Sequence, residues 1–205
     1  MGYEKIFEKL KKWYEGVDAP VVWLINFQGS NPEKVLVSAI LSTRTKDETT
    51  LAASEKLFKK INGLIDLRKL SIKEIERLIY PVGFYRTKAK HLKELSKIGK
   101  VPDNFDELIK LPGVGRKVAS LYLTVVHNKD EICVDTHVHR ISNRLGWVKS
   151  ENPLGTEKAL KLILPKNYWK SINYLFVALG QKICTPRTPK CSVCVINKYC
   201  KKVFI

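Results

Sequence analysis

Apolar residues recur at three- and four-residue spacing through nearly the whole chain, which is the pattern of amphipathic helices. In the first such stretch, residues 4–14, the apolar positions are Ile6, Phe7, Leu10, Trp13 and Tyr14. Alternating strand patterns of any length are missing from the sequence. The pattern therefore predicts an all-α protein of about ten helices joined by short connections.

Capping residues and helix breakers divide this pattern into separate elements. Ser71 followed by Glu74 predicts a capping box, and Asn104 followed by Glu107 predicts a second capped helix start. Glycine and proline lie between the helical segments. Besides these two starts, helices are expected at residues 35–40, 51–61, 87–98, 118–126, 138–145, 157–164 and 171–181.

The composition is that of a folded and strongly basic protein. The chain has 205 residues, of which 44% are hydrophobic and 28% charged, so wholesale disorder is excluded. This length suits one large domain or two small ones. The 37 Lys and Arg residues against 20 Asp and Glu give a net charge of +17. Such a surplus favours a polyanionic partner such as nucleic acid, although solubility alone is the simpler alternative.

Neither a membrane span nor a secretory signal is expected. No stretch approaches about 18 uninterrupted apolar residues, the length a spanning helix needs. The first fifteen residues contain acidic side chains and lack an apolar signal core. We therefore expect a protein of the prokaryotic cytoplasm.

Four of the five cysteines cluster near the C-terminus, with the spacing C-x6-C-x2-C-x5-C. They are Cys184, Cys191, Cys194 and Cys200. Residues 182–205 contain basic but no acidic side chains. A basic, cysteine-rich tail on a chain with no expected secretory signal favours a metal site over a secreted disulfide framework. One CxxC pair flanked by single cysteines suits a [4Fe–4S] cluster better than tetrahedral zinc. Zinc and four unligated thiols are the alternatives, and Cys133 is expected to be a buried core thiol.

A second motif is a glycine-containing turn between two helices. It reads Leu111-Pro112-Gly113-Val114-Gly115-Arg116-Lys117. Gly113 and Gly115 permit backbone conformations and close approaches that a Cβ atom blocks. The first amides of the following helix then form a phosphate site, to which Arg116 and Lys117 add positive charge. The alternative is an ordinary glycine-capped helical hairpin.

These motifs occur in the same order in a known family. The hairpin, the segment Val134–Arg140 and the cysteine loop resemble those of the endonuclease III family, helix-hairpin-helix DNA glycosylases of base excision repair. The resemblance extends from Leu36 to Cys200. It implies a two-lobed fold with a DNA cleft between the lobes. A six-helix barrel would span residues 26–131 and contain the hairpin, and residues 1–25 with 132–205 would form the lobe that carries the cluster.

The resemblance assigns a catalytic pair to Lys117 and Asp135. A carboxylate such as Asp135 stabilises the positive charge that develops on the sugar when the glycosidic bond breaks. A neutral lysine amine attacks C1′ and forms a Schiff base, which permits β-elimination. The alternatives are that Lys117 only contacts phosphate and that Asp135 only caps the helix beginning near Thr136.

The target base must leave the duplex to be reached, and the family fills the gap with protruding side chains. The matching positions are Arg44, where many relatives have glutamine, Phe84, where leucine is common, and His137. Two of these assignments have alternatives, since Phe84 is equally suited to the core and His137 to a capping role at a helix start.

The resemblance implies a bifunctional DNA glycosylase and AP lyase that acts on oxidised or ring-saturated pyrimidines. Its partner would be double-stranded DNA containing damaged bases or abasic sites, and we expect a monomer. One alternative is a monofunctional glycosylase that removes thymine or uracil opposite guanine; the presence of Lys117 argues against it. Another is a DNA-binding protein without catalytic activity, which needs neither Lys117 nor Asp135 at the family spacing.

Overall fold

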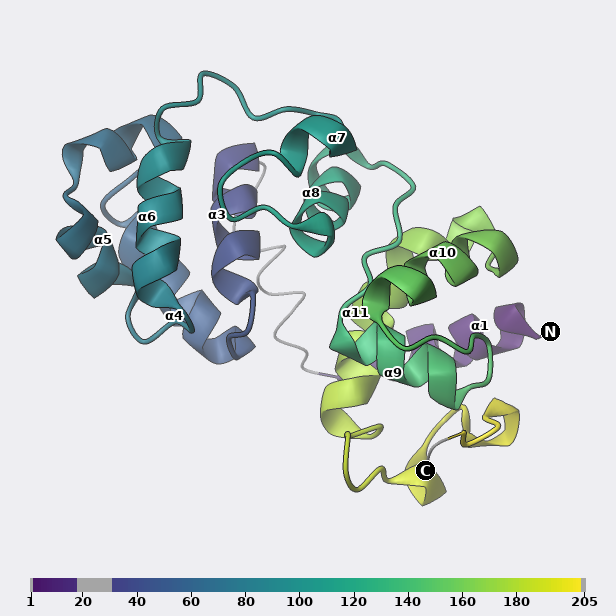
Figure 1. Cartoon of the computed structure of the whole chain (residues 1–205). Helices are drawn as coiled ribbons and strands as arrows, with labels where there is room; N and C mark the ends of the chain where they lie inside the picture. The colour runs from purple at the N-terminus through teal and green to yellow at the C-terminus, as the bar shows by residue number, and fades with distance from the viewer. Residues whose placement is uncertain (1, 18–30, 204–205) are drawn as a thin grey trace. The chain divides into compact units, whose positions relative to one another are not determined.

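The computed structural model describes residues 2–17 and 31–203, which form helices, turns and loops without any strand (Figure 1). The predicted all-α fold is confirmed. The chain divides into two compact units. We call Val22–Lys129 the hairpin unit, and Met1–Val21 together with Asp130–Ile205 the cysteine unit. The domain ranges implied by the resemblance stay a prediction. None of the described helices is both long and apolar enough to cross a lipid bilayer.

The described part of the hairpin unit is built around one central helix, α3 (Pro32–Ser42). Asn31 caps α3 by accepting hydrogen bonds from the amides of Glu33 and Lys34. Every residue from 35 to 41 is buried, as expected of a helix surrounded by others. It packs against α4, α6 and α8. The remaining helices are α4 (Asp47–Phe58), η1 (Leu64–Lys69), α5 (Ile72–Ile79), α6 (Tyr85–Leu95), α7 (Phe105–Leu108) and α8 (Arg116–His127).

The predicted helix starts are confirmed where a side-chain cap defines them. Ser71 and Glu74 form the complete capping box of α5, and Asn104 accepts the amide hydrogen of Glu107 at the start of α7. The helix expected at 87–98 instead begins at Tyr85 and ends at Leu95. Its start differs because no side chain caps it, so the sequence carried no capping signal there.

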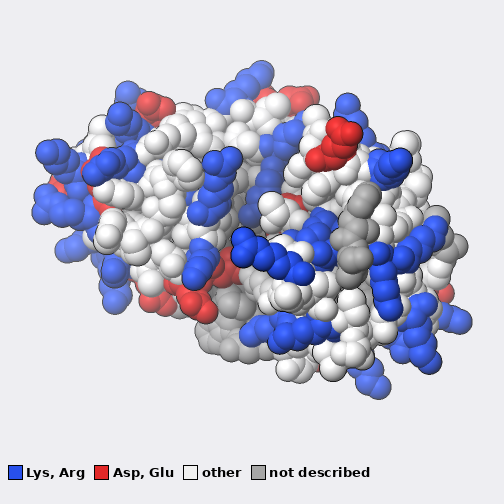
Figure 2. All heavy atoms as spheres, turned by 60° about the horizontal axis from the view of Figure 1, so that its bottom comes forward, with Lys and Arg blue, Asp and Glu red and all other residues white. Residues whose placement is uncertain are grey.

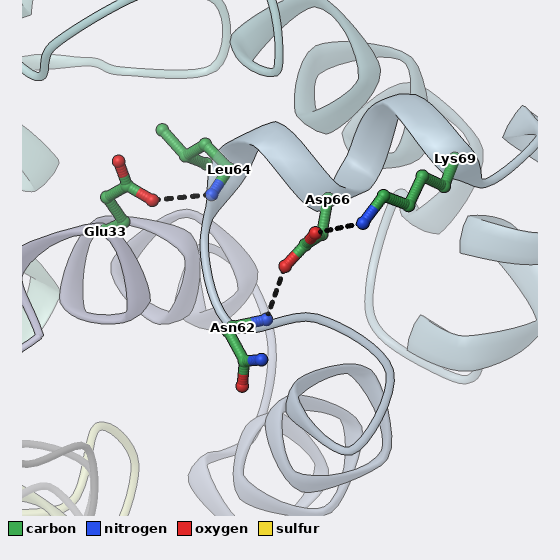
Figure 3. A network of polar contacts seen from close by, with 5 residues as sticks. All are labelled: Glu33, Asn62, Leu64, Asp66 and Lys69. Atoms are coloured by element: carbon green, nitrogen blue, oxygen red, sulfur yellow. Dashed lines mark hydrogen bonds and ion pairs between the residues drawn. The ribbon is translucent and has the colours of Figure 1, made fainter.

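Polar contacts fix the short helix η1 to α3 (Figure 3). The amide of Leu64 donates to Glu33 Oε2 of α3 at 2.6 Å, which satisfies one of the unpaired amides of η1. The amide of Asn62 and the ammonium of Lys69 both donate to Asp66. The hydrogen bond from Lys69 lowers the pKa of Asp66. The end of α3 that faces away from the candidate site is thereby anchored.

The cysteine unit joins the first helix of the chain to its last third. Aromatic rings form part of this core: Phe7 stacks on Tyr168 with ring centres 4.3 Å apart, and Trp147 and Phe176 lie next to Phe7. Helix α11 packs against α1 and α9, and α9 packs against α10. The helices are α1 (Tyr3–Tyr14), α9 (Thr136–Arg144), α10 (Pro153–Ile163), η2 (Lys166–Tyr168), α11 (Trp169–Lys182), η3 (Cys191–Val193) and η4 (Asn197–Tyr199).

Candidate active site

The two glycines of the turn between α7 and α8 differ in conformation and surroundings. One has a left-handed backbone, and the other faces open space. Gly113 has φ +76°, in the left-handed region, and a Cβ there would lie 2.8 Å from His91 Nδ1. Gly115 has an extended backbone, and a Cβ there would meet nothing within 4 Å. Gly115 is also the N-cap of α8, and no side chain caps this helix. The first amides of α8 are therefore suited to an anion.

The two basic residues after Gly115 extend in different directions. The Arg116 guanidinium lies 4.7 Å from the ring centre of Phe105 in α7, so it packs across the hairpin. Lys117 is half-buried, and its Nζ donates to Ser42 Oγ at 3.4 Å. Ser42 is the last residue of α3. The amine proposed for catalysis therefore lies at the C-terminal end of the central helix.

Two further candidate residues meet at the same end of the hairpin unit. Arg44 and Phe84 both have left-handed backbones, with φ of +50° and +57°. The Arg44 guanidinium lies 5.4 Å from the centre of the Phe84 ring. Phe84 is 61% exposed, so its alternative assignment to the core is wrong. Strained backbones that hold exposed side chains in place are typical of functional sites.

Lys88 also belongs to this region, although no role was predicted for it. It is 5% exposed, and its Nζ donates to the carbonyl oxygens of Leu41 and Thr43 and to Thr45 Oγ1. Burial lowers the pKa of Lys88 to about 8, and the charge of Lys117 adds to this effect. A signal was present, since Lys88 shares the buried face of α6 with apolar side chains.

Asp135 is the N-cap of α9, as its alternative interpretation predicted. Its Oδ1 accepts hydrogen bonds from the amides of His137 and Val138 at 2.9 and 2.8 Å. The His137 ring is turned toward the same helix, with Nδ1 3.1 Å from Arg140 Nη2. Asp135 and His137 lie in the cysteine unit, whereas Lys117 lies in the hairpin unit. Capping engages only one of the two carboxylate oxygens, so it leaves the proposed electrostatic role open.

Two arginines connect α9 to the loop that contains the first clustered cysteine. Arg140 donates to the carbonyl oxygens of Cys184 and Gly180. Arg144 donates to Cys184 Sγ at 3.3 Å and to the carbonyl oxygen of Thr185 at 2.7 Å. No role was predicted for either arginine. Their spacing of four residues on one helix face was the available signal.

The four clustered cysteines line a single cavity in the cysteine unit. Its other lining residues include Ile141, Leu145 and Ile196. Four thiols around one cavity are the ligand set of a [4Fe–4S] cluster, as their spacing along the chain predicts.

The environment of these thiols also fits a cluster. Burial raises the pKa of Cys194 and of Cys200, and the neighbouring cysteines add to this effect, so the thiolate forms need a cationic centre. The amide of Lys202 donates to Cys200 Sγ at 3.4 Å, and Arg144 bonds to Cys184 as described above. Such N–H donors to sulfur are part of the normal surroundings of iron–sulfur clusters.

Basic side chains are prominent on one face of the molecule. On the face shown in Figure 2, Lys and Arg clearly outnumber Asp and Glu. This agrees with the net charge of +17 and with a polyanionic partner.

The fold and these motifs define a helix-hairpin-helix DNA-repair protein, and comparison with known proteins gives the same class. Residues 37–166 match the HhH-GPD superfamily of base excision DNA repair proteins, and residues 184–200 match the iron–sulfur binding domain of endonuclease III. Two solved endonuclease III–DNA complexes, one a trapped covalent intermediate and one non-covalent, are similar to the chain at 30% identity. Their TM-scores are 0.84 and 0.85, and the matches cover 98% and 97% of this chain and 97% and 94% of theirs.

Curated relatives carry the same name. Endonuclease III of Thermotoga maritima is 46% identical over 86% of this chain and 85% of its own. The chloroplastic endonuclease III homolog 2 of Arabidopsis thaliana is 42% identical over 98% of this chain, which spans 58% of that longer protein. The chain belongs to the endonuclease III family. It is a bifunctional DNA glycosylase and AP lyase of base excision repair with a [4Fe–4S] cluster.

Proposed function

We propose that this enzyme excises oxidised or ring-saturated pyrimidines from double-stranded DNA and cleaves the resulting abasic strand through a Schiff base on Lys117. The observation that carries this proposal is the position of Lys117 in the first turn of α8, beside the end of α3. The loop of residues 43–46, which we call the Arg44 loop, follows directly after that end. The phosphate site begins at Gly115, and the Lys117 amine follows two residues later, so both can serve one substrate.

The chemistry follows from the groups present. The damaged base leaves with the electron pair of the C1′–N bond, and the Lys117 amine forms a bond to C1′. The amine loses a proton, the C1′–O4′ bond breaks and O4′ takes up a proton, which gives the protonated imine. Loss of a 2′ proton to solvent follows, and the 3′ phosphate then leaves with the electron pair of the C3′–O bond. The Asp135 carboxylate stabilises the positive charge that develops on the sugar while the base departs.

Arg44, Phe84 and His137 are proposed to hold the opened duplex. Phe84 presents an exposed ring that can wedge between bases, and the Arg44 guanidinium both fills space and donates hydrogen bonds to an orphaned base. The hairpin residues Gly113, Gly115 and Arg116 are proposed to contact the phosphate backbone of the DNA. These contacts position the duplex and do not read its base sequence. We further propose that the enzyme acts as a monomer in the prokaryotic cytoplasm, where its substrate is the DNA of the nucleoid.

One assay tests the proposed function against its alternatives. Pure protein is incubated with duplexes containing dihydrouracil, a guanine–thymine mismatch or a preformed abasic site, with and without borohydride. Release of dihydrouracil, strand cleavage and a trapped adduct support the proposal. Release of thymine without an adduct would favour the monofunctional glycosylase, and binding alone would favour a non-catalytic protein.

The ligands of the cluster are proposed to be Cys184, Cys191, Cys194 and Cys200, which line the cavity. We expect about four irons per chain and a broad absorption near the border of the visible and ultraviolet. Cys194→Ser is expected to lose iron and to unfold at a markedly lower temperature, because cluster binding stabilises the loop. Cys133, which is buried as expected of a core thiol, is the control, since Cys133→Ala should keep its iron. One zinc per chain without iron would contradict the cluster assignment.

Substitution of Gly115 is expected to separate DNA binding from folding. Gly115→Asn places a good N-cap on α8, so the free energy of unfolding should stay equal or rise. Its side chain occupies the open space and takes up the amides, so affinity for undamaged duplex should fall about tenfold, the equivalent of one charge-assisted hydrogen bond. Filter binding over a range of salt concentrations measures this.

Gly99 is a suitable control for this experiment, since a Cβ there also meets nothing within 4 Å. Gly99→Asn should bind undamaged duplex like the wild type. Gly113→Asn should differ from both by losing stability, because a Cβ at Gly113 lies close to His91. Normal duplex binding by Gly115→Asn would show that the hairpin amides do not contact DNA.

A further inference from the structure

Lys88 occupies an unusual position between the two loops that carry Arg44 and Phe84. It lies in the first turn of α6, directly after Phe84, and its side chain crosses to the end of α3. There its Nζ donates to the carbonyl oxygens of Leu41 at 2.8 Å and Thr43 at 2.6 Å, and to Thr45 Oγ1 at 3.2 Å. The three acceptors match the three N–H groups of an ammonium.

Thr45 completes the connection between the loops. Its hydroxyl also accepts a hydrogen bond from the amide of Gly83 at 3.1 Å. A Cβ at Gly83 would clash with the carbonyl oxygen of Arg44, so the two backbones are in direct contact. The buried ammonium, the hydroxyl and the glycine therefore hold together the loops from which the Arg44 and Phe84 side chains extend.

Lys88 combines burial with a complete set of hydrogen bonds. Burial lowers the pKa of Lys88 to about 8, which means that its surroundings disfavour the charged form. Lys93, on the same helix, makes a similar set of three hydrogen bonds at the end of another helix. Its Nζ donates to the carbonyl oxygens of Leu67, Arg68 and Leu70 from a partly exposed position, where it completes the end of η1.

We propose that Lys88 is a positioning residue for base extrusion. Its ammonium group fixes the Arg44 loop to the turn of residues 80–84, which contains Phe84. The Arg44 and Phe84 side chains then enter the duplex in one geometry. The inference rests on the proposed function, in which Arg44 and Phe84 hold the opened duplex. A side chain that takes the place of an extruded base must be held in one position by the residues that support it. Small displacements of such a side chain lower the rate of the reaction strongly.

The test compares a step that needs extrusion with one that does not. Single-turnover excision of dihydrouracil from a fully paired duplex requires a base pair to open. Borohydride trapping at a preformed abasic site does not, because no base pair remains to be opened there. Lys88→Met should slow excision about 100-fold, the effect of a misplacement near 1 Å, and change trapping less than about threefold. The fluorescence of 2-aminopurine next to the target site should rise on wild-type binding and remain low with the variant.

Lys93→Met is the matched control, because it removes the same kind of hydrogen bonds from the same helix. It should leave the ratio of excision to trapping unchanged. Thr45→Val should reproduce the selective loss, and Thr45→Ser should restore it, which keeps the proposal testable should Lys88→Met not fold.

The inference is overturned by a wild-type ratio in both Lys88→Met and Thr45→Val, or by a similar selective loss in Lys93→Met. Equal loss of excision and trapping would also overturn it, since Lys88 would then act on Lys117. Failure of the proposed function looks different: the wild type itself would give no trapped adduct, while the fluorescence still reports extrusion.

Discussion

Lys117→Gln is expected to give no borohydride-trapped adduct and no strand cleavage, while it keeps most of its affinity for abasic duplex. An amide nitrogen cannot form a Schiff base, so the loss should be complete within detection. Glutamine removes one positive charge from a chain with a surplus of 17. The slope of affinity against salt concentration should therefore change by about one counterion at most.

The hairpin itself supplies the control for this variant. Lys110 is an exposed lysine just before the turn, and Lys110→Gln removes the same charge without touching the end of α3. It should keep full trapping and lose a similar amount of affinity. The measurement is adduct yield on denaturing gels beside binding isotherms for both variants. Adduct formation by Lys117→Gln at the wild-type level would mean that another amine performs the chemistry.

Features that depend on neighbouring residues were predictable from the sequence. The capping box of Ser71 and Glu74, the cap at Asn104 and the left-handed Gly113 all follow from local hydrogen bonds and local sterics. The all-α fold also followed, because helical periodicity is a property of short windows. Local rules thus placed the hairpin, although the range 118–126 expected for its second helix begins two residues later than α8 does.

Features that depend on contacts across the sequence were not predictable in this way. Lys88 is separated from Leu41 by 47 residues, so its hydrogen bond is visible only in the folded chain. The same holds for the cation–π contact of Arg44 with Phe84. From the sequence, Phe84 could be assigned either to the core or to an exposed DNA-contacting position, because phenylalanine is usually buried. Its exposure depends on the left-handed turn after Gly83, where the Arg44 backbone leaves no room for a side chain.

Asp135 shows that two interpretations of one residue can be compatible. The structure confirms its capping role, and the proposed catalytic role needs a negative charge that capping does not require. Asparagine is about as good an N-cap as aspartate, and its Oδ1 can accept the same two amides. Asp135→Asn therefore removes the charge and keeps the cap, which separates the two roles in one protein.

Asp135→Asn is expected to unfold at nearly the wild-type temperature but to release damaged bases about 100- to 1000-fold more slowly, the usual effect of removing a well-placed charge-stabilising group. Asp135→Ala, by contrast, should also lose about 1 kcal/mol of stability, because the amides of His137 and Val138 lose their acceptor. Thermal unfolding beside single-turnover base release measures both effects.

The two catalytic variants should differ on a preformed abasic site. No base has to leave there, so no positive charge of base departure develops on the sugar for Asp135 to stabilise, and Asp135→Asn should still form a trapped adduct while Lys117→Gln forms none. Comparing trapping with excision for each variant therefore separates the nucleophile from the group that stabilises the sugar. Complete loss of trapping in folded Asp135→Asn would contradict this division, because Asp135 would then be the base that takes the proton from Lys117.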